Sequence, residues 1–277
     1  PSVTSPLDRT IRAPLPAAMS ASGATALGAA IVPSSLVGAL ILASFPPLRA
    51  ILFDLDGTLV ESAPDLHATL VEVTAELGVA APSLPELRAM IGDGARVLIR
   101  RALDAAGHPD DPELLERLFQ SFLARYTANP CRHSFIYPGV VPVLTDLKAS
   151  GIRMGVCTNK PYAPTLGLLD ALGLAGFFGA VVGGDSLPVR KPDPEHALAT
   201  LRALEIPPEE AIFVGDSTND VVTARAAGMK VIVVSFGYTT IPPRELGADL
   251  VIDHFDDLPA AIDQLRPGSR PAGRIAS

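Results

Sequence analysis

Residues 50–62 read AILFDLDGTLVES, a short apolar run followed at once by two acidic residues. The run from Ala50 to Phe53 is typical of a buried strand in a parallel sheet, where both faces are covered. Asp54 and Asp56 lie just past its end. Because two neighbouring carboxylates both ionise only beside a cation, the pair indicates a site for a hard divalent metal.

The rest of the chain repeats this alternation of strand and helix. Five further apolar runs, bounded by Gly, Asp, Ser or Thr, cover residues 152–157, 180–182, 211–214, 231–234 and 250–252. Helical periodicity fills the gaps at residues 140–150, 162–172, 194–204 and 219–227. The pattern predicts an α/β fold with a doubly wound, Rossmann-like parallel sheet as its core. Ligands of such sheets bind at the carboxyl ends of the strands.

One region shows helical periodicity alone. Residues 65–132 contain no strand-like run, so we expect a small all-helical cap domain, inserted after the first strand. It would lie above the carboxyl end of that strand, where it could serve as a lid. The catalytic core would then consist of residues 49–64 and 133–265.

The two ends of the chain differ from the middle. No charged residue lies between Arg12 and Arg49, and prolines interrupt the apolar stretch between them. We interpret residues 1–48 as a leader that is disordered or non-native; a targeting segment and a membrane anchor are the alternatives. Residues 266–277 are rich in Arg, Pro, Gly and Ser, which predicts a disordered tail.

Composition narrows the classes of function. Of the 277 residues 48% are hydrophobic, which is enough for a sizeable core, and the net charge is −8. That charge argues against nucleic acid as a partner, and no membrane partner is expected. Only two cysteines are present, which favours a reducing compartment and a cytoplasmic location. The sequence leaves open whether the protein is a monomer or a homodimer.

Polar residues at other predicted strand ends could join the first pair. Thr158 and Asn159 offer a hydroxyl and an amide to a phosphate, and Lys191 offers a positive charge. Asp216 could complete a Mg²⁺ site, with Asp220 one helical turn beyond. Taken singly, these residues are better explained as turns, helix caps and a solvated lysine than as a functional site. Their common position at strand ends favours a phosphoryl-transfer site.

Four motifs carry a family resemblance. They read FDLDGTLVES, VCTNK, RKPDP and VGDSTND, and over about residues 49–265 the chain resembles the haloacid dehalogenase-like hydrolases. The resemblance implies that Asp54 is the nucleophile and Asp56 the general acid/base. Dehalogenases of the family lack the second aspartate of the first motif, so Asp56 indicates phosphate chemistry.

The same resemblance implies the remaining roles. Thr158 and Lys191 would bind the phosphoryl group, together with Asn159. Asp216 would bind Mg²⁺ with Asp54 and the backbone carbonyl of Asp56, and Asp220 would support both the metal and Lys191.

Within that family, the segments LVESAPDL, IGDGARVLIRRAL, YPGV and GGDSLPVRKPDP look like those of phosphoglycolate phosphatases. This likeness implies hydrolysis of 2-phosphoglycolate, a small phosphorylated acid, through an aspartyl-phosphate. Gly92, Gly94 and Arg96 of the cap would then face the substrate, with Arg100 or Arg101 offering a further cation for its carboxylate. The chain departs from the subgroup at Glu61, where an aspartate is usual, and in its leader.

Three other functions stay open on the sequence alone. The chain could be a phosphatase or pyrophosphatase that acts on another small phosphate compound. It could be a sugar phosphomutase, because such mutases also keep both aspartates of the first motif. A non-catalytic relative is a further alternative, against which the complete set of polar residues argues.

Overall fold

The computed structural model describes residues 47–265, and its centre is a six-stranded sheet in the order β5-β4-β1-β6-β7-β8. Every neighbouring pair of strands in this sheet is parallel. The strands are β1 (Ala50–Phe53), β4 (Arg153–Cys157), β5 (Ala180–Val182), β6 (Ala211–Gly215), β7 (Lys230–Val234) and β8 (Leu250–Ile252). The predicted α/β fold with a doubly wound parallel sheet is confirmed.

The order of the strands brings the predicted polar residues to one edge. The chain builds outward from β1 through β4 to β5, then returns to add β6, β7 and β8 on the other side. Phe53 is in register with Val156 on one side and Val214 on the other. The residues that follow these three strands are therefore neighbours at the carboxyl edge, beside the point where the direction of winding changes.

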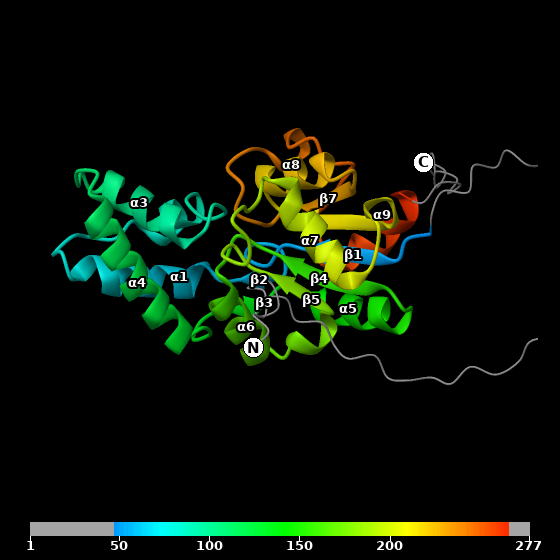
Figure 1. Cartoon of the computed structure of the whole chain (residues 1–277), viewed down its shortest axis with the longest axis horizontal. Helices are drawn as coiled ribbons and strands as arrows, with labels where there is room; N and C mark the ends of the chain where they lie inside the picture. The colour runs from blue at the N-terminus through cyan, green and yellow to red at the C-terminus, as the bar shows by residue number, and fades with distance from the viewer. Residues whose placement is uncertain (1–46, 266–277) are drawn as a thin grey trace, which may run out of the picture.

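Helices cover both faces of the sheet (Figure 1). Ile51 and Phe53 of β1 belong to the apolar cluster on one face, and Ala50 and Leu52 to the cluster on the other. Because side chains alternate along a strand, a strand covered on both faces is apolar throughout. The first face is covered by α5 (Val140–Ala149), α6 (Tyr162–Ala171) and α9 (Leu258–Leu265), and the second by α7 (Pro194–Leu204) and α8 (Thr218–Ala226).

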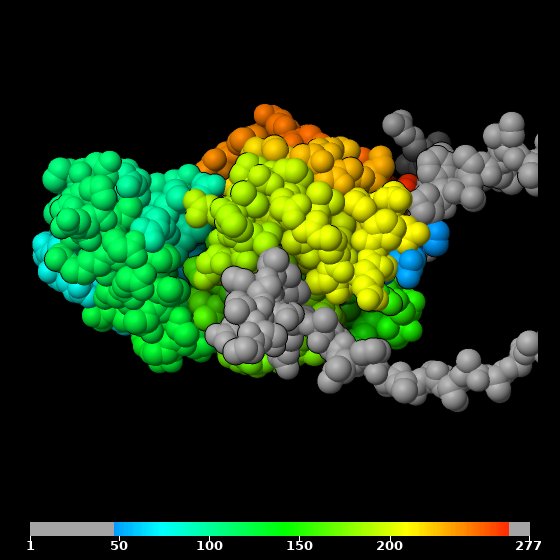
Figure 2. All heavy atoms as spheres, in the orientation of Figure 1, coloured from blue at the N-terminus to red at the C-terminus, as the bar shows by residue number. Residues whose placement is uncertain are grey.

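A helical insertion follows β1, as predicted. It contains α1 (Ala63–Ala75), α2 (Leu84–Arg88), α3 (Ala95–Ala105) and α4 (Pro112–Ala128). These helices pack around an apolar cluster of their own, which includes Leu70, Ile99 and Phe122. Figure 1 shows them beyond one end of the sheet, and Figure 2 shows them in contact with the sheet-containing part.

Asp65 joins the two ends of this insertion. It lies in the first turn of α1, is 2% exposed, and accepts backbone hydrogen bonds from Arg132, His133 and Ser134 at 2.8–3.0 Å. The Ser134 hydroxyl donates a fourth at 2.6 Å. Burial acts to raise the pKa of Asp65, but these hydrogen bonds outweigh it and hold the pKa below its usual value.

Three elements were not predicted from the sequence. Two strands of two residues each, β2 (Val60–Glu61) and β3 (Phe135–Ile136), pair antiparallel where the chain leaves and rejoins the core. Helix α9 is the third. Short 3-10 helices complete the structure at Ala175–Phe177, Pro208–Glu210, Pro243–Glu245 and Phe255–Asp257.

The predicted leader and tail fall almost wholly on residues 1–46 and 266–277, which lie outside the described part of the chain. Among residues 47–265, no helix has the length and apolar character needed to cross a membrane.

Candidate active site

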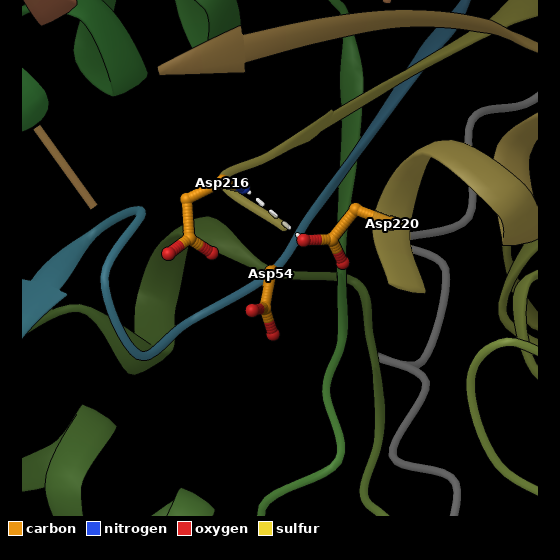
Figure 3. Close-up of side chains that lie close together, drawn as sticks. All are labelled: Asp54, Asp216 and Asp220. Carbon is orange, nitrogen blue, oxygen red and sulfur yellow. Dashed lines mark hydrogen bonds between the residues drawn. The ribbon is translucent and has the colours of Figure 1, made fainter. Parts of the chain in front are cut away.

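Three carboxylates meet at the carboxyl edge of the sheet. Asp54 follows β1, Asp216 follows β6, and Asp220 lies in the first turn of α8. Each offers an oxygen that lies within 4.8 Å of those of the other two. Figure 3 shows the three side chains directed toward a common region. The structure thus brings together residues that are up to 166 positions apart in the sequence.

Lys191 balances part of this negative charge. It is 3% exposed, and its Nζ lies 2.9 Å from Asp54 Oδ1 and 2.6 Å from Asp220 Oδ1. The approach to Asp54 has poor hydrogen-bond geometry, so Asp54 Oδ1 is buried without a hydrogen-bond partner among the described residues. Burial raises the pKa of Asp54 to about 6, against the opposing effect of Lys191. Such a carboxylate has unused capacity for a cation or an electrophile.

Asp220 holds its neighbours in place. Its Oδ2 accepts hydrogen bonds from the backbone of Asp216 and from the backbone and hydroxyl of Ser217, at 2.7–3.1 Å. Its Oδ1 accepts the hydrogen bond from Lys191. With both oxygens engaged, Asp220 is better suited to orient Lys191 and Asp216 than to bind a metal directly.

Asp54 and Asp216 fit the requirements of a Mg²⁺ site. Asp216 Oδ2 accepts a hydrogen bond from the Tyr238 backbone at 2.6 Å, while its Oδ1 has only a 3.4 Å contact with the Thr58 hydroxyl. Burial, Asp220 and Asp54 all raise the pKa of Asp216. A Cβ atom at Gly237 would overlap the Asp216 carboxylate, so the backbone forms a close cradle around it. Two buried carboxylates with spare oxygens match the hard ligands that Mg²⁺ prefers.

Asp56 has a different environment from Asp54. Its Oδ1 accepts a hydrogen bond from the Ser62 hydroxyl at 2.5 Å, and Lys160 Nζ contacts both of its oxygens at 3.2 and 3.3 Å. Lys160 is 5% exposed, and its Nζ also donates to the Tyr126 hydroxyl at 2.8 Å. Desolvation acts to lower the pKa of Lys160, but Asp56 and Tyr126 outweigh it and raise the pKa.

The sequence interpretation missed Lys160 and Tyr126. Lys160 stands in the VCTNK motif directly after the two predicted phosphate-binding residues, and that adjacency was a usable signal. Tyr126 lies on α4, 34 positions before Lys160. Its place in the helical periodicity predicts only that it belongs to an apolar face. No local pattern could have joined it to the site.

Thr158 and Asn159 both lie where predicted, but their side chains are used differently. Thr158 is 2% exposed, and its Oγ1 accepts a hydrogen bond from the Lys160 backbone at 3.3 Å. Asn159 Nδ2 donates to the carbonyls of Gly92 and Lys191 at 2.9 and 3.0 Å. The amide group predicted to bind phosphate is therefore engaged, and the structure assigns Asn159 a positioning contact with the Lys191 loop.

A cavity of about 40 Å³ opens beside Asp54 and Asp56. Its wall combines the polar residues of the strand ends with apolar side chains of the insertion, and Gly92 and Gly94 are among the residues that line it. Space of this size holds about three water molecules, or the small organic part of a substrate.

The structure does not bring Arg96 to this cavity. Its guanidinium pairs with Glu116 and lies 4.4 Å from the centre of the Phe119 ring, and its side chain is 44% exposed. The predicted substrate contact of Arg96 is therefore corrected: α3 directs this residue toward α4. Arg100 and Arg101 are likewise engaged, with Asp110 and Asp93 respectively.

Residues 91–94 connect the insertion to the core. Besides the Asn159 contact with Gly92, Asn219 Nδ2 donates to Asp93 Oδ1 at 2.7 Å. A second cavity of about 210 Å³ lies here, between Asp56, Asp93 and Asp216. These hydrogen bonds hold residues 92 and 93 of the insertion against the carboxyl edge of the sheet.

The sequence matches the family described as "Haloacid dehalogenase-like hydrolase" over residues 51–234. It is 46% identical to a phosphoglycolate phosphatase of Caulobacter vibrioides over 213 residues, which cover 76% of this chain and 89% of that protein. A phosphoglycolate phosphatase of Rhodospirillum rubrum is 43% identical over 230 residues, or 81% of this chain and 95% of that protein.

A solved structure extends the likeness to three dimensions. The "predicted phosphoglycolate phosphatase" of Haemophilus somnus 129pt superposes with a TM-score of 0.74 at 34% identity, covering 78% of this chain and 98% of that one. Sequence and fold agree. The chain belongs to the haloacid dehalogenase-like hydrolase family.

Proposed function

We propose that this protein is a Mg²⁺-dependent phosphatase that hydrolyses 2-phosphoglycolate to glycolate and phosphate. One observation carries the proposal: the carboxylates of Asp54 and Asp56 lie on the same turn but have different surroundings. Asp54 is buried against Lys191, whereas Asp56 faces Ser62 and Lys160. Two carboxylates that differ in this way can act as nucleophile and as general acid/base. Identities of 42–46% to phosphoglycolate phosphatases support the substrate.

In the first step, an Asp54 carboxylate oxygen attacks phosphorus. A bond forms between this oxygen and phosphorus, and the bond from phosphorus to the ester oxygen breaks. Asp56 transfers its proton to the departing oxygen, so glycolate leaves with a neutral hydroxyl. Lys191 and Thr158 bind the phosphoryl oxygens and hold the group in line with Asp54.

The second step regenerates the enzyme. Asp56 is now a carboxylate, and it takes a proton from a water molecule that attacks phosphorus. The bond from phosphorus to the Asp54 oxygen breaks, and phosphate leaves. Asp54 recovers its carboxylate and Asp56 its proton, so each residue ends the cycle in its starting state.

Asp54 and Asp216, with the backbone carbonyl of Asp56, would hold Mg²⁺, and Asp220 would support them. Four aspartates (Asp54, Asp56, Asp216 and Asp220) face two lysines (Lys160 and Lys191), which leaves two excess negative charges when all are ionised. When bound, the ion would neutralise this excess and the charge of the transferring phosphoryl group.

Residues 65–132 would act as the cap of this active site. Their hydrogen bonds to the core at residues 92 and 93 support a cap that lies against the strand ends. A cytoplasmic location and a monomeric or homodimeric state stay predictions.

A panel of substrates tests the proposal. Phosphate release with Mg²⁺ would be measured for 2-phosphoglycolate, glycerol 3-phosphate, pyrophosphate and glucose 1-phosphate. We expect 2-phosphoglycolate to lead in kcat/KM by about tenfold or more, a difference of about 1.4 kcal/mol. If another ester or pyrophosphate leads by that margin, the assigned substrate is wrong. Conversion of glucose 1-phosphate to an isomer would identify a mutase.

A further inference from the structure

Lys160 provides the positive charge of the substrate cavity. Among the described residues that line the cavity, it is the sole lysine or arginine. Much of the remaining wall is apolar, including Leu66, Ile91, Leu98 and Phe122. An ammonium group in such surroundings interacts strongly with an anion, because little water screens the charge. A second negative group of a substrate would find in Lys160 the one cationic side chain among the described residues of this wall.

Lys160 and Tyr126 can both offer a donor to that group. An ammonium carries three protons, and Lys160 Nζ contacts both oxygens of Asp56 and the Tyr126 hydroxyl. The two contacts with Asp56 are the longer ones, at 3.2 and 3.3 Å, so an oxygen of the substrate can replace one of them while the other is kept. The Tyr126 hydroxyl accepts a hydrogen bond from Lys160, and its own proton has no acceptor among residues 47–265. The hydrogen bond between Lys160 Nζ and the Tyr126 hydroxyl holds these two donor groups side by side. Each could donate to one of the two oxygens of a carboxylate.

The position of Asp56 sets where this carboxylate would lie. To protonate the ester oxygen, Asp56 must come within about 2.6–3.2 Å of it. Lys160 Nζ lies 3.2 Å from the same Asp56 carboxylate. In 2-phosphoglycolate a single methylene carbon separates the ester oxygen from the carboxylate, so the carboxylate falls near Lys160 when the ester oxygen meets Asp56.

We propose that Lys160 Nζ and the Tyr126 hydroxyl bind the substrate carboxylate, and that this contact selects small phosphorylated carboxylic acids. The inference rests on the proposed function and names the residues that recognise the part of the substrate beyond phosphate. It replaces the cap arginines, which are paired with acidic residues of the insertion. The loop after β4 then binds both ends of the substrate, the phosphate at Thr158 and the carboxylate at Lys160.

Lys160→Met tests the proposal with two matched substrates. Ethyl phosphate has the carbon skeleton of 2-phosphoglycolate with a methyl group in place of the carboxylate. We expect the variant to raise KM for 2-phosphoglycolate and to lower the preference for it over ethyl phosphate, measured as a ratio of kcat/KM, by about tenfold or more. Lys148→Met, on the exposed lysine of α5, is the control and should keep the wild-type ratio.

Each other outcome decides against the proposal. An equal loss of activity on both substrates would show that Lys160 acts through Asp56, and an unchanged ratio would show no role in recognition. If Lys160→Met fails to fold, Tyr126→Phe tests the proposal instead, because it removes a single hydroxyl group. We expect this variant to lower the ratio of kcat/KM for 2-phosphoglycolate over ethyl phosphate by about threefold or more. An unchanged ratio overturns the proposal. A wild-type enzyme without preference for 2-phosphoglycolate would instead refute the proposed function.

Discussion

Asp54 and Asp56 lie on one turn, but their carboxylates contact different side chains. Asp54 is 7% exposed and shares Lys191 with Asp220, while Asp56 contacts Lys160 and Ser62. The sequence predicts both carboxylates from the end of a strand. It does not predict their difference, because the contacts come from residues far along the chain.

Asp54→Asn tests the nucleophile. An amide oxygen is a far weaker nucleophile than a carboxylate, so we expect kcat to fall by about 10³-fold or more. The substitution removes a buried charge and keeps the shape, so the protein should stay folded. Phosphate release and thermal unfolding would be measured, with Asp170→Asn on the surface of α6 as the control. Near-normal turnover of Asp54→Asn would refute a covalent mechanism.

Gly237→Ala tests the cradle of Asp216. The added Cβ would overlap the Asp216 carboxylate, so that side chain must move. We expect kcat/KM to fall by about tenfold or more and the Mg²⁺ concentration for half-maximal activity to rise. Gly176→Ala is a matched control, because its Cβ would meet no atom within 4 Å. A Gly237→Ala enzyme with the Mg²⁺ dependence of the wild type would argue against Asp216 as a ligand.

At the scale of elements, the apolar runs predicted the strands of the main sheet well. They did not predict strands that form only by pairing with a segment far away in the sequence. The runs at Ala50–Phe53 and Ala180–Val182 coincide with β1 and β5. In contrast, β2 and β3 have two residues each and pair across about 75 positions, so neither shows a periodicity. Arg96 was misplaced for a similar reason: helical spacing gives the face of α3 but not its partner, which is Glu116 of α4.

Asp65→Asn tests the contact that joins the ends of the insertion. The pKa of Asp65 is lowered in the folded state, so its carboxylate stabilises the fold above the unfolded pKa of about 4, and this contribution is lost as the pH falls through the folded value. We expect the variant to lower the free energy of unfolding by about 1–3 kcal/mol at pH 7.

The difference between Asp65→Asn and the wild type should shrink as the pH falls below about 4, because the unfolded carboxyl is protonated first and the native carboxyl follows at its lower pKa. Urea unfolding of both proteins between pH 7 and values below about 4 would measure this difference in the free energy of unfolding. Asp104→Asn, at an exposed position of α3, is the control and should change stability little at any pH. A difference independent of pH would show that the charge of Asp65 is not what stabilises the junction.

At the scale of the molecule, the cavity belongs to neither part alone. Tyr126 and Phe122 come from the insertion, and Asp54 and Lys160 from the core. The two parts meet along one side in Figure 2, and the contact of Asn219 with Asp93 ties them together. The sequence predicts an insertion above the strand ends. Which of its side chains reach the site follows from packing that no local pattern records.

Metal binding should be visible in the stability of the whole molecule. Asp54, Asp56, Asp216 and Asp220 outnumber Lys160 and Lys191 by two charges when all are ionised and by one when Asp56 is protonated, so a divalent cation relieves repulsion in the folded state. At Mg²⁺ concentrations about 100-fold above Kd, we expect about 2.7 kcal/mol of added stability. For a chain of this size that corresponds to a rise in Tm of about 5–10 °C.

Chelation of divalent metal should abolish activity and lower Tm by this amount, and added Mg²⁺ should restore both. Asp216→Asn should remove the Tm response, because it takes away one of the two spare carboxylates, whereas Asp170→Asn should keep it. Thermal unfolding at a series of Mg²⁺ concentrations measures the response without relying on turnover. If Asp216→Asn kept the full shift, the ion would bind elsewhere, and the negative charge at the sheet edge would have to be balanced by another group.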